Sequence, residues 1–538
     1  MMLTRRHHAT VPQTATEPSA NSPPSRWKSG RLLGWLAVAG LPLLAVLILP
    51  GMILSGMSLY NTAQAGQDEK NGPIRTLTIL AAGDLRGEIE PCGCSPEGQM
   101  GGLRRRMSYL ERRFASGQPL LVDLGNNFPP PQGAPGQGRL KVKLINTLLP
   151  RFAPRAILPG PNEIAFGLRA LNRRLPYLLS NDAAGKFFAP YRTVRRDGLV
   201  IGIYGYLSPN EVYQGSQSAF RLVKVDHALL RLLRSSIRRE GHSVALLLFR
   251  GGGAELETFV KSGLFDLIVS GNPSDNELQQ VTVRKVGDVS VPQVPTKGQG
   301  VLRIQLAIRG GTSGQSRRGA VPAPVRVDWL TDKWQDHAGA APAFKEYNRK
   351  VAASFTAFLK TMESQKRDSP YAGAKRCIVC HAAAGAAWEK SRHANALKTL
   401  EKVGKNFDPE CLACHVVGRN RVGRHRGVRP SGVPGVPVVR VGNDPAPGGF
   451  LSRQLTPKLA GVQCENCHGP GRAHAANPTV KFAARPGPVP VARSAGGAGQ
   501  DPRANSRPGE FTCRTCHVGS HSPTFDFKVY WPKVMHGK

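Results

Sequence analysis

The sequence predicts a multidomain protein with an N-terminal transmembrane helix, an α/β layered sandwich and a mainly α-helical, irregular C-terminal domain. Three observations predict this arrangement. A long apolar run lies within residues 31–60, short apolar stretches alternate with helical periodicity in residues 73–330, and a five-residue motif occurs four times in residues 371–538. The 538 residues leave room for two or three domains, each with its own core.

The first 60 residues carry a targeting pattern. Residues 1–30 are polar and basic, and we expect a disordered cytoplasmic tail. Residues 31–60 are nearly all apolar and long enough to span a bilayer, with the basic flank before them, which predicts export of the rest. We expect an inner-membrane anchor. Because residues 63–65 (Ala-Gln-Ala) resemble a signal-peptidase site, a cleaved secretory form is the alternative.

Residues 73–330 alternate apolar runs with helical spacing, which is typical of an α/β layered domain. The runs expected to be buried strands are Leu77–Leu80, Leu120–Val122, Ala156–Leu158, Tyr177–Leu179, Leu199–Tyr204, Val244–Phe249 and Leu267–Val269. The expected helices are Leu103–Phe114, Leu140–Phe152 and His227–Arg239. An added antiparallel part is expected from Val281–Val289, Val301–Ile308 and Val321–Leu330.

A helical linker is expected over residues 331–370. Residues 345–367 place five apolar side chains on one stripe, which predicts an amphipathic helix packed on a neighbour: Tyr347, Val351, Phe355, Phe358 and Met362. In the following domain, residues 371–538, the only other periodic segment is a helix around Ala386–Leu400.

The repeated motif in this last domain is C-x-x-C-H, the attachment pattern of c-type haem. Two thiols bind the haem covalently and the adjacent histidine binds iron. Paired cysteines also occur in zinc sites and disulfide frameworks, but neither requires a histidine directly after the second cysteine. We therefore expect four covalently bound haems. The attachment residues are Cys377, Cys380, Cys411, Cys414, Cys464, Cys467, Cys513 and Cys516, and the adjacent histidines are His381, His415, His468 and His517.

The chain is strongly basic, since Lys and Arg outnumber Asp and Glu 73 to 36, a formal charge of +37. The propionates of the expected haems would offset part of this charge. The Arg residues are spread along the chain, and no nucleic-acid motif accompanies them. We expect redox partner proteins, acidic ones in particular, and no nucleic acid.

The last domain resembles the tetrahaem cytochrome c-554 family over residues 371–538. The resemblance rests on W-E-K-S-R-H-A (388–394) after the first motif, on C-H-G-P-G (467–471) leading to His474, and on the end of the chain, with Ser522-Pro523, Phe525, Tyr530-Trp531-Pro532 and His536. It implies three haems with two axial histidines each and one haem open on its distal side.

Carried over by position, His393, His474 and His536 match the distal ligands of the family. His425 lies in an Arg-rich loop and His521 falls where the family has no ligand, so we expect both to be solvated or hydrogen-bonded. Spacing alone does not tell which motif holds the open haem.

Residues 74–330 resemble the calcineurin-like metallophosphoesterases and 5′-nucleotidases. The resemblance rests, in order, on A-G-D-L-R-G (82–87), V-D-L-G-N (122–126), G-P-N-E (160–163) with Phe166-Gly167, Ser180-Asn181, L-F-R (248–250) and S-G-N-P-S (270–274). Such enzymes hold two metal ions with Asp, His and Asn ligands. Asp84 and Asp123 keep their types. The other matching positions carry Arg86, Asn126, Pro161, Asn162, Arg250, Asn272 and Ser274. Because guanidinium groups repel cations, we expect no dimetal centre in this domain.

A Cys-Gly-Cys pair, Cys92 and Cys94, follows in the segment E-P-C-G-C (90–94), and no other cysteine lies outside the four motifs. In an oxidising compartment such a pair fits a strained disulfide, a thiol redox centre or part of a metal site. The segment is similar to one in a group of nucleotidase-like proteins, some joined to such cytochromes. Our hypothesis is a redox pair that exchanges electrons with the haems, and an inert disulfide is the alternative.

The sequence therefore predicts an extracytoplasmic tetrahaem cytochrome, on the periplasmic side, that transfers electrons. One alternative is an oxidoreductase that acts on a small nitrogen-type substrate at a five-coordinate haem, because an open axial position permits ligand binding. The other is a phosphoesterase. Electron transfer is favoured, and among enzymes an oxidoreductase is favoured over a hydrolase.

Overall fold

The computed structural model describes residues 74–91, 99–130, 135–183, 185, 187–212, 221–271, 283–309, 320–322, 325–363, 368–419, 448–480, 510–517, 522 and 525–536. The expected membrane segment, residues 31–60, lies outside them. Within these ranges no helix is both long and apolar enough to cross a bilayer. All of these described residues belong to one compact unit.

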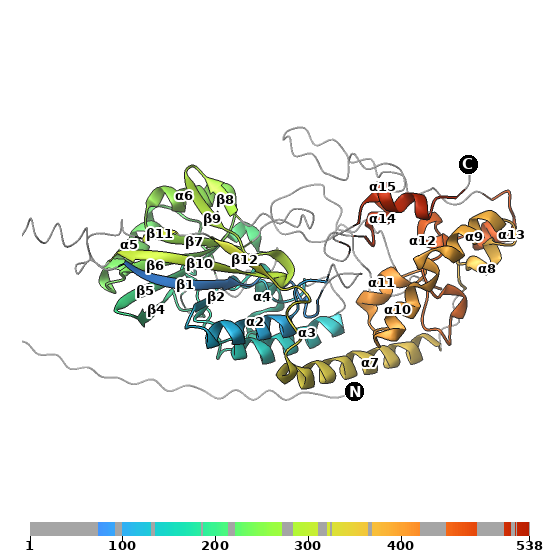
Figure 1. Ribbon diagram of the computed structural model, residues 1–538, viewed down its shortest axis with the longest axis horizontal. Helices are drawn as coiled ribbons and strands as arrows, with labels where there is room; N and C mark the ends of the chain where they lie inside the picture. Colours follow the sequence, from blue (N-terminus) through green and yellow to red (C-terminus); the bar gives the residue numbers. More distant parts are fainter. Residues whose placement is uncertain are drawn as a thin grey trace, which may run out of the picture. The chain divides into compact units, whose positions relative to one another are not determined.

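The front domain, residues 74–330, contains two mixed sheets (Figure 1). The first has the order β11-β10-β1-β2-β3, with β12 also paired to β10. The second has the order β4-β5-β6-β7, and β8 and β9 form a separate hairpin. The strands are β1 (Ile74–Ala82), β2 (Leu120–Asp123), β3 (Ala156–Ile157), β4 (Tyr191–Arg196), β5 (Leu199–Leu207), β6 (Val244–Arg250), β7 (Leu267–Ser270), β8 (Val283–Val286), β9 (Val289–Pro292), β10 (Gly300–Arg309), β11 (Ala320–Pro322) and β12 (Arg326–Trp329).

Helices connect the parallel strands, which cannot be joined by tight turns. The helices of the front domain are α2 (Leu103–Ala115), α3 (Pro135–Leu148), α4 (Pro161–Phe166), α5 (His227–Arg239) and α6 (Gly253–Ser262). The strand β1 pairs in parallel with β2, and β2 with β3, so that α2 and α3 lie in the crossovers. In the second sheet β5, β6 and β7 are parallel, with α5 and α6 between them.

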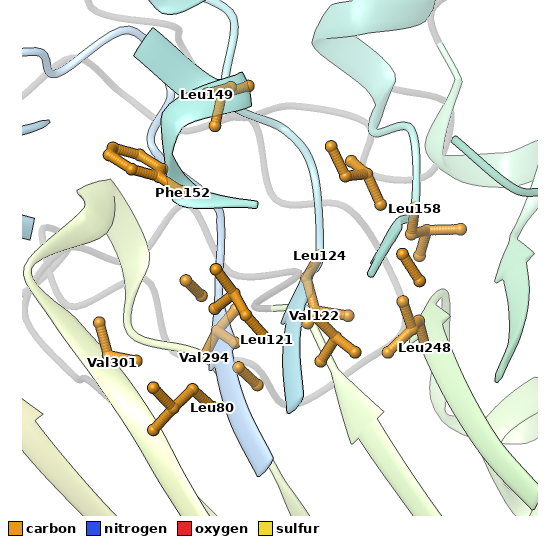
Figure 2. Close-up of a cluster of buried hydrophobic side chains, with 14 of the residues drawn as sticks. Leu80, Leu121, Val122, Leu124, Leu149, Phe152, Leu158, Leu248, Val294 and Val301 are labelled. Carbon is orange, nitrogen blue, oxygen red and sulfur yellow. The ribbon is translucent and has the colours of Figure 1, made fainter. Parts of the chain in front are cut away.

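Alternation along the central strands builds the core. On β5 and β6, Ile203 and Leu246 pack toward the first sheet, whereas Tyr204 and Leu247 pack against α5 and α6. Figure 2 shows Leu80 of β1 and Leu248 of β6 among the side chains of one buried cluster. Each fully buried side chain of this size contributes about 1.5–3 kcal/mol. The predicted α/β layered domain is confirmed.

The C-terminal part is helical and held by short elements. A long helix, α7 (Ala341–Glu363), precedes it. The shorter helices are α8 (Ala374–Cys377), α9 (Ala382–Lys390), α10 (Ala396–Lys402), α11 (Pro409–His415), α12 (Cys464–His468), α13 (Arg472–Ala476), α14 (Glu510–Arg514) and α15 (Phe527–Tyr530), with further 3-10 turns. The described core of this part is small and includes Leu397, Leu412, Val416, Phe450 and Leu459. The predicted helical C-terminal region is confirmed.

Two local predictions were wrong. The run Tyr177–Leu179 forms only isolated bridges, to Ile157 and Ala189, because Pro176 has no N–H to continue a ladder. The single helix expected over 386–400 is two helices, α9 and α10, separated by a 3-10 turn, Arg392–Asn395. Ser391 breaks the helix because its backbone is extended, with ψ 156°.

Candidate haem centres and the front-domain site

The described parts of the four C-x-x-C-H motifs each lie on a helical turn. In the first and fourth motifs the histidine N–H donates to the carbonyl of the first cysteine, at 3.0 Å (His381 to Cys377) and 2.9 Å (His517 to Cys513). Residues three apart on a helical turn share a face, so the two thiols of a motif lie side by side. Among the described residues no motif cysteine forms a disulfide, which leaves the thiols available for covalent attachment.

Three of the motif histidines face the three histidines matched to distal ligands. The ring centroids are 6.2 Å apart for His381 and His474, 6.1 Å for His517 and His393, and 5.8 Å for His468 and His536. An imidazole nitrogen lies about 2 Å from a bound metal ion, so two rings on opposite sides of one ion have centroids about 6 Å apart. The separations of all three pairs therefore fit an iron between the rings.

The backbone fixes the ring nitrogen available to iron. The Nδ1 of His474 lies 2.8 Å from the carbonyl oxygen of Val480, and the Nδ1 of His536 lies 2.9 Å from that of Val534. A carbonyl oxygen only accepts, so Nδ1 carries the proton and Nε2 is the nitrogen left to bind a metal. Such a hydrogen bond is the usual support of a metal-ligating histidine.

The histidine of the second motif, His415, has the same support. Its Nδ1 lies 2.7 Å from the carbonyl oxygen of Ala396 at the start of α10, and 3.4 Å from the Oγ1 of Thr399. The three distal candidates lie beside the histidines of the first, third and fourth motifs. His425 and His521 lie outside the described residues.

Burial keeps two of the paired imidazoles neutral. It lowers the pKa of His393, with a further contribution from His415, and it lowers the pKa of His517 to about 4, with contributions from His393 and His415. A metal binds the neutral imidazole, so both side chains are in the ligating form at neutral pH.

Side chains that the sequence reasoning missed hold the first and third motifs together. Glu465, an intervening residue of the third motif, accepts N–H groups of Ala372 and Gly373 at 2.8 Å each and of Gly471 at 2.7 Å. Gln463 accepts the N–H of Ala374 at 2.6 Å. No signal in the sequence marks these residues, because Glu465 occupies an intervening position of C-x-x-C-H, which tolerates any residue type, and Gln463 lies before the motif.

The position of His393 depends on the turn between α9 and α10. The indole Nε1 of Trp388 donates to the carbonyl oxygen of Val462 at 2.7 Å, and the N–H of Val462 donates to the carbonyl oxygen of His393 at 3.1 Å. These bonds tie the turn to the chain just before the third motif. The helix break that the sequence did not predict thus presents His393 to His517.

In the front domain, the residues matched to metal ligands lie at the carboxyl ends of β1, β2 and β6. Ala82 and Asp123 are paired at the ends of β1 and β2, and Arg250 ends β6. Asp84 is fully buried and accepts from Asn126 Nδ2 at 2.9 Å, Arg250 Nη2 at 3.0 Å and Arg86 Nε at 3.1 Å. Two guanidinium groups therefore contact a carboxylate that the sequence comparison matched to a metal ligand.

These charges set the pKa of Asp84. Burial acts to raise it, but the positive charges of Arg86 and Arg250 outweigh burial, and the pKa is lowered. Asp123 is also buried, and burial raises its pKa although Arg106 and Asn127 oppose the shift.

A third arginine, Arg106, was not singled out from the sequence. It is fully buried, with its Nη1 3.9 Å from Asp123 Oδ2. It lies within the run Arg104-Arg105-Arg106, and only burial in the fold separates it from the partly exposed Arg104.

Two further matched residues, Pro161 and Asn162, have structural roles in the backbone of this region. Asn162 donates from Nδ2 to the carbonyl oxygen of Phe128 at 2.8 Å, and Pro161 begins α4. Within the described part of the chain, no three His, Cys, Asp or Glu side chains gather as a metal-binding group. Asn272, Ser274, Cys92 and Cys94 lie outside the described residues.

Comparison with known proteins finds a family and a curated protein similar to the C-terminal part. Residues 376–431 and 440–469 match the family described as cytochrome c554 and c-prime. Cytochrome c-554 of Nitrosomonas europaea is 30% identical over 137 residues, which are 23% of this chain and 47% of the relative. The chain thus spans about half the length of this curated relative. The resemblance of the C-terminal residues to that family is confirmed.

Solved structures similar to this chain include nucleotidases and phosphoesterases, the families that residues 74–330 resemble in sequence. The 5′-nucleotidase precursor of Thermus thermophilus has a TM-score of 0.43 and 20% identity over 52% of this chain and 59% of its own. The sulfate thiohydrolase SoxB of Thermus thermophilus has a TM-score of 0.41 and 16% identity, and the match covers 50% of this chain and 60% of that protein. The calcineurin-like phosphoesterase YfkN of Bacillus subtilis has a TM-score of 0.38 and 14% identity, and the match covers 52% of this chain and 98% of that structure's chain.

Proposed function

We propose that the chain is an extracytoplasmic c-type cytochrome that carries four covalently bound haems and transfers electrons between redox partner proteins. The observation that supports this most is the pairing of three motif histidines with three distal histidines at centroid separations of 5.8–6.2 Å. When bound, a haem with two axial histidines supplies one-electron chemistry without an open site. The protein's own backbone orients the imidazoles of His415, His474 and His536 through hydrogen bonds to Nδ1.

The axial ligands follow from these pairs. His381 and His474 would hold the first haem, His468 and His536 the third, and His517 and His393 the fourth. His415 would be the proximal ligand of the second haem. Because the three distal histidines serve the other motifs, the second haem is the one that we assign as open on its distal side.

An open second haem supports a second candidate function, an oxidoreductase that acts on a small nitrogen-type substrate. The two functions share the same four haems and differ in whether the open iron turns over a substrate. Turnover assays with small nitrogen compounds separate them, since a pure electron carrier exchanges electrons with partner proteins but forms no product.

The front domain would contribute no hydrolysis. Asp84 is already bonded to Arg250 and Arg86, whose charges repel a metal ion from this carboxylate. A phosphatase assay with added manganese or zinc tests this point, and activity that depends on either metal would revive the phosphoesterase alternative.

Cys92 and Cys94 would act as a redox pair with the haems. Oxidation of two thiols to a disulfide releases two electrons and two protons, so two haems would accept one electron each and solvent the protons. Glu90, two residues before Cys92, forms a 2.6 Å ion pair with Lys405, which precedes the second motif. If Cys92→Ser with Cys94→Ser leaves the rates of haem reduction unchanged, the inert-disulfide alternative holds.

Optical and EPR spectroscopy of the purified holoprotein, with haem and metal analysis, tests the main proposal. We expect four haems per chain, three low-spin signals and one high-spin signal. A wholly low-spin oxidised protein would remove the open haem and the oxidoreductase with it, and a haem content below four would remove the tetrahaem assignment.

A further inference from the structure

The helix that carries the second haem motif is short and is fixed at its N-terminal end. It is α11, which runs from Pro409 to His415 and contains both attachment cysteines and the proximal histidine. Asp408 caps it, because its Oδ1 accepts the N–H of Glu410 at 3.0 Å. Whatever holds Asp408 and Glu410 therefore sets the position of the haem attached to this helix.

Residues of the front domain hold these two carboxylates. Gln137, near the start of α3, donates from Nε2 to Asp408 Oδ1 at 2.8 Å, the same oxygen that caps α11. One turn later on α3, Lys141 Nζ lies 2.6 Å from Glu410 Oε2. A third contact is the 2.6 Å ion pair of Lys405 with Glu90.

The charge on Lys141 is enclosed. Its side chain is only 6% exposed, against 40% for that of Glu410. Burial alone would lower the pKa of Lys141, but Glu410 and Glu88 raise it, so the amine stays protonated at neutral pH. A buried cation interacts with nearby charges far more strongly than a solvated one, because little water screens it.

We propose that Lys141 of the front domain is a positioning residue for the second haem, which it serves by holding α11 through Glu410 and by fixing a positive charge beside the attachment site. Gln137 completes this support at the cap residue Asp408. The inference rests on the proposed function in taking α11 to carry a haem. It gives the front domain a role that needs no metal: it forms part of the surroundings of the second haem.

The sign of the effect follows from the charges. Reduction of a ferric haem adds one negative charge, so a nearby cation favours the reduced form. In Lys141→Gln the carboxylate of Glu410 loses its partner, and the region around α11 becomes more negative. The oxidised form of the second haem is then favoured.

The experiment is spectroelectrochemical titration of the holoprotein, with spin state followed by EPR. For Lys141→Gln we expect an about tenfold shift of the reduction equilibrium of one haem toward the ferric form, or about 59 mV for a one-electron couple. The other three haems should keep their midpoint potentials. Lys141→Arg should stay close to wild type, and Lys143→Gln, an exposed residue of the same helix, should change nothing.

A double variant separates charge from packing. Lys141→Gln with Glu410→Gln removes both charges, so the potential of the affected haem should return toward the wild-type value. The proposal fails if Lys141→Gln leaves all four midpoint potentials unchanged or shifts them equally. It also fails if Lys141→Gln, Lys141→Arg and the double variant all lose a haem. A wild-type protein without a high-spin haem would contradict the proposed open site but not this inference, which a shift confined to one haem still supports.

Discussion

The carbonyl oxygens of Val480 and Val534 determine more than the orientation of two rings. By accepting from the Nδ1 of His474 and His536, they leave Nε2 as the ring nitrogen that can bind iron. Both histidines are presented by the backbone of short segments near α13 and α15. Either of these distal histidines can therefore be substituted singly without disturbing a long helix or strand.

Replacing His474 by Ala should open the first haem. The haem stays attached through Cys377 and Cys380 and keeps its proximal His381, but it loses its sixth ligand and changes from low spin to high spin. EPR of the oxidised protein should show one additional high-spin signal. His227→Ala, at an exposed position on α5, is the matched control and should leave the spectrum unchanged. An unchanged spectrum for His474→Ala would contradict the axial assignment.

Arg250→Ala should strongly destabilise the front domain. Arg250 and Asp84 are both fully buried, and removal of the guanidinium leaves a buried carboxylate with part of its compensation gone. Breaking a buried pair in this way costs about 3–5 kcal/mol. Denaturant unfolding measures the loss. The pair Arg196–Asp197 supplies the control, because its side chains are 26% and 72% exposed and Arg196→Ala should cost at most about 1 kcal/mol.

The cost of Arg250→Ala should depend on pH in a defined direction. In the wild type the pKa of Asp84 is lowered below its usual 3.8, so its ionised form stabilises the fold above that pH and this contribution is lost as the pH falls through the native pKa. In the variant, burial raises the pKa of Asp84. The difference in stability should therefore be largest at neutral pH and shrink in acid. A difference that grows in acid would show that Asp84 is not the group left uncompensated.

At the scale of elements, α7 belongs to two cores. Phe344, Tyr347 and Val351 in its first half pack into the core of the front domain. Phe355, with Phe358 beside it, packs into the core of the C-terminal part. The sequence predicted this amphipathic helix, and it begins at Ala341, four residues earlier than the periodicity indicated.

Breaking α7 between these halves should uncouple the two parts. Ala353 is exposed, so Ala353→Pro disturbs the helix at a cost of about 3 kcal/mol without removing a core side chain. We expect haem absorbance and far-UV circular dichroism to report one shared unfolding transition in the wild type and two separate transitions in Ala353→Pro. Ala353→Gly, at about 1 kcal/mol, should keep them together. Coincident transitions in Ala353→Pro would mean that α7 does not couple the parts.

Sequence patterns predicted the elements that periodicity controls and missed those that tertiary contacts control. The buried strands from Leu199 and Val244 were found because their apolar runs are continuous. The strand β4, with Arg and Thr on a half-exposed edge, has no such run and was missed. The break at Ser391 was also missed, since it depends on bonds to Val462.

The same division applies to the candidate sites. Motif spacing indicated every proximal histidine, and family resemblance the distal ones. The matching of particular pairs, such as His393 with His517, joins distant parts of the chain and could only come from the fold. The sequence indicated that Arg86 and Arg250 stand at ligand positions, but their contacts with Asp84 came from the fold. The burial of Arg106 and of Lys141 was not indicated, because neither lies in a pattern that distinguishes it from surface basic residues.

At the scale of the whole molecule, the formal charge of +37 should govern encounters with redox partners. We expect the rate of electron transfer to an acidic partner protein, followed by stopped flow, to fall steeply as ionic strength rises. The range from 0.01 M to 0.15 M shortens the Debye length from about 30 Å to about 8 Å. An uncharged small-molecule oxidant is the control and should show little dependence. A salt-independent rate with the acidic partner would exclude electrostatic steering.

The shared helix α7 also constrains the order in which the two parts can fold during synthesis. A chain made from its N-terminus cannot close the front-domain core until Val351 has emerged, and the next turn of the same helix carries Phe355, around which the C-terminal part assembles. Separation of the two parts within α7 would expose apolar side chains on both fragments. Neither part would then keep its complete core, so each depends on being joined to the other.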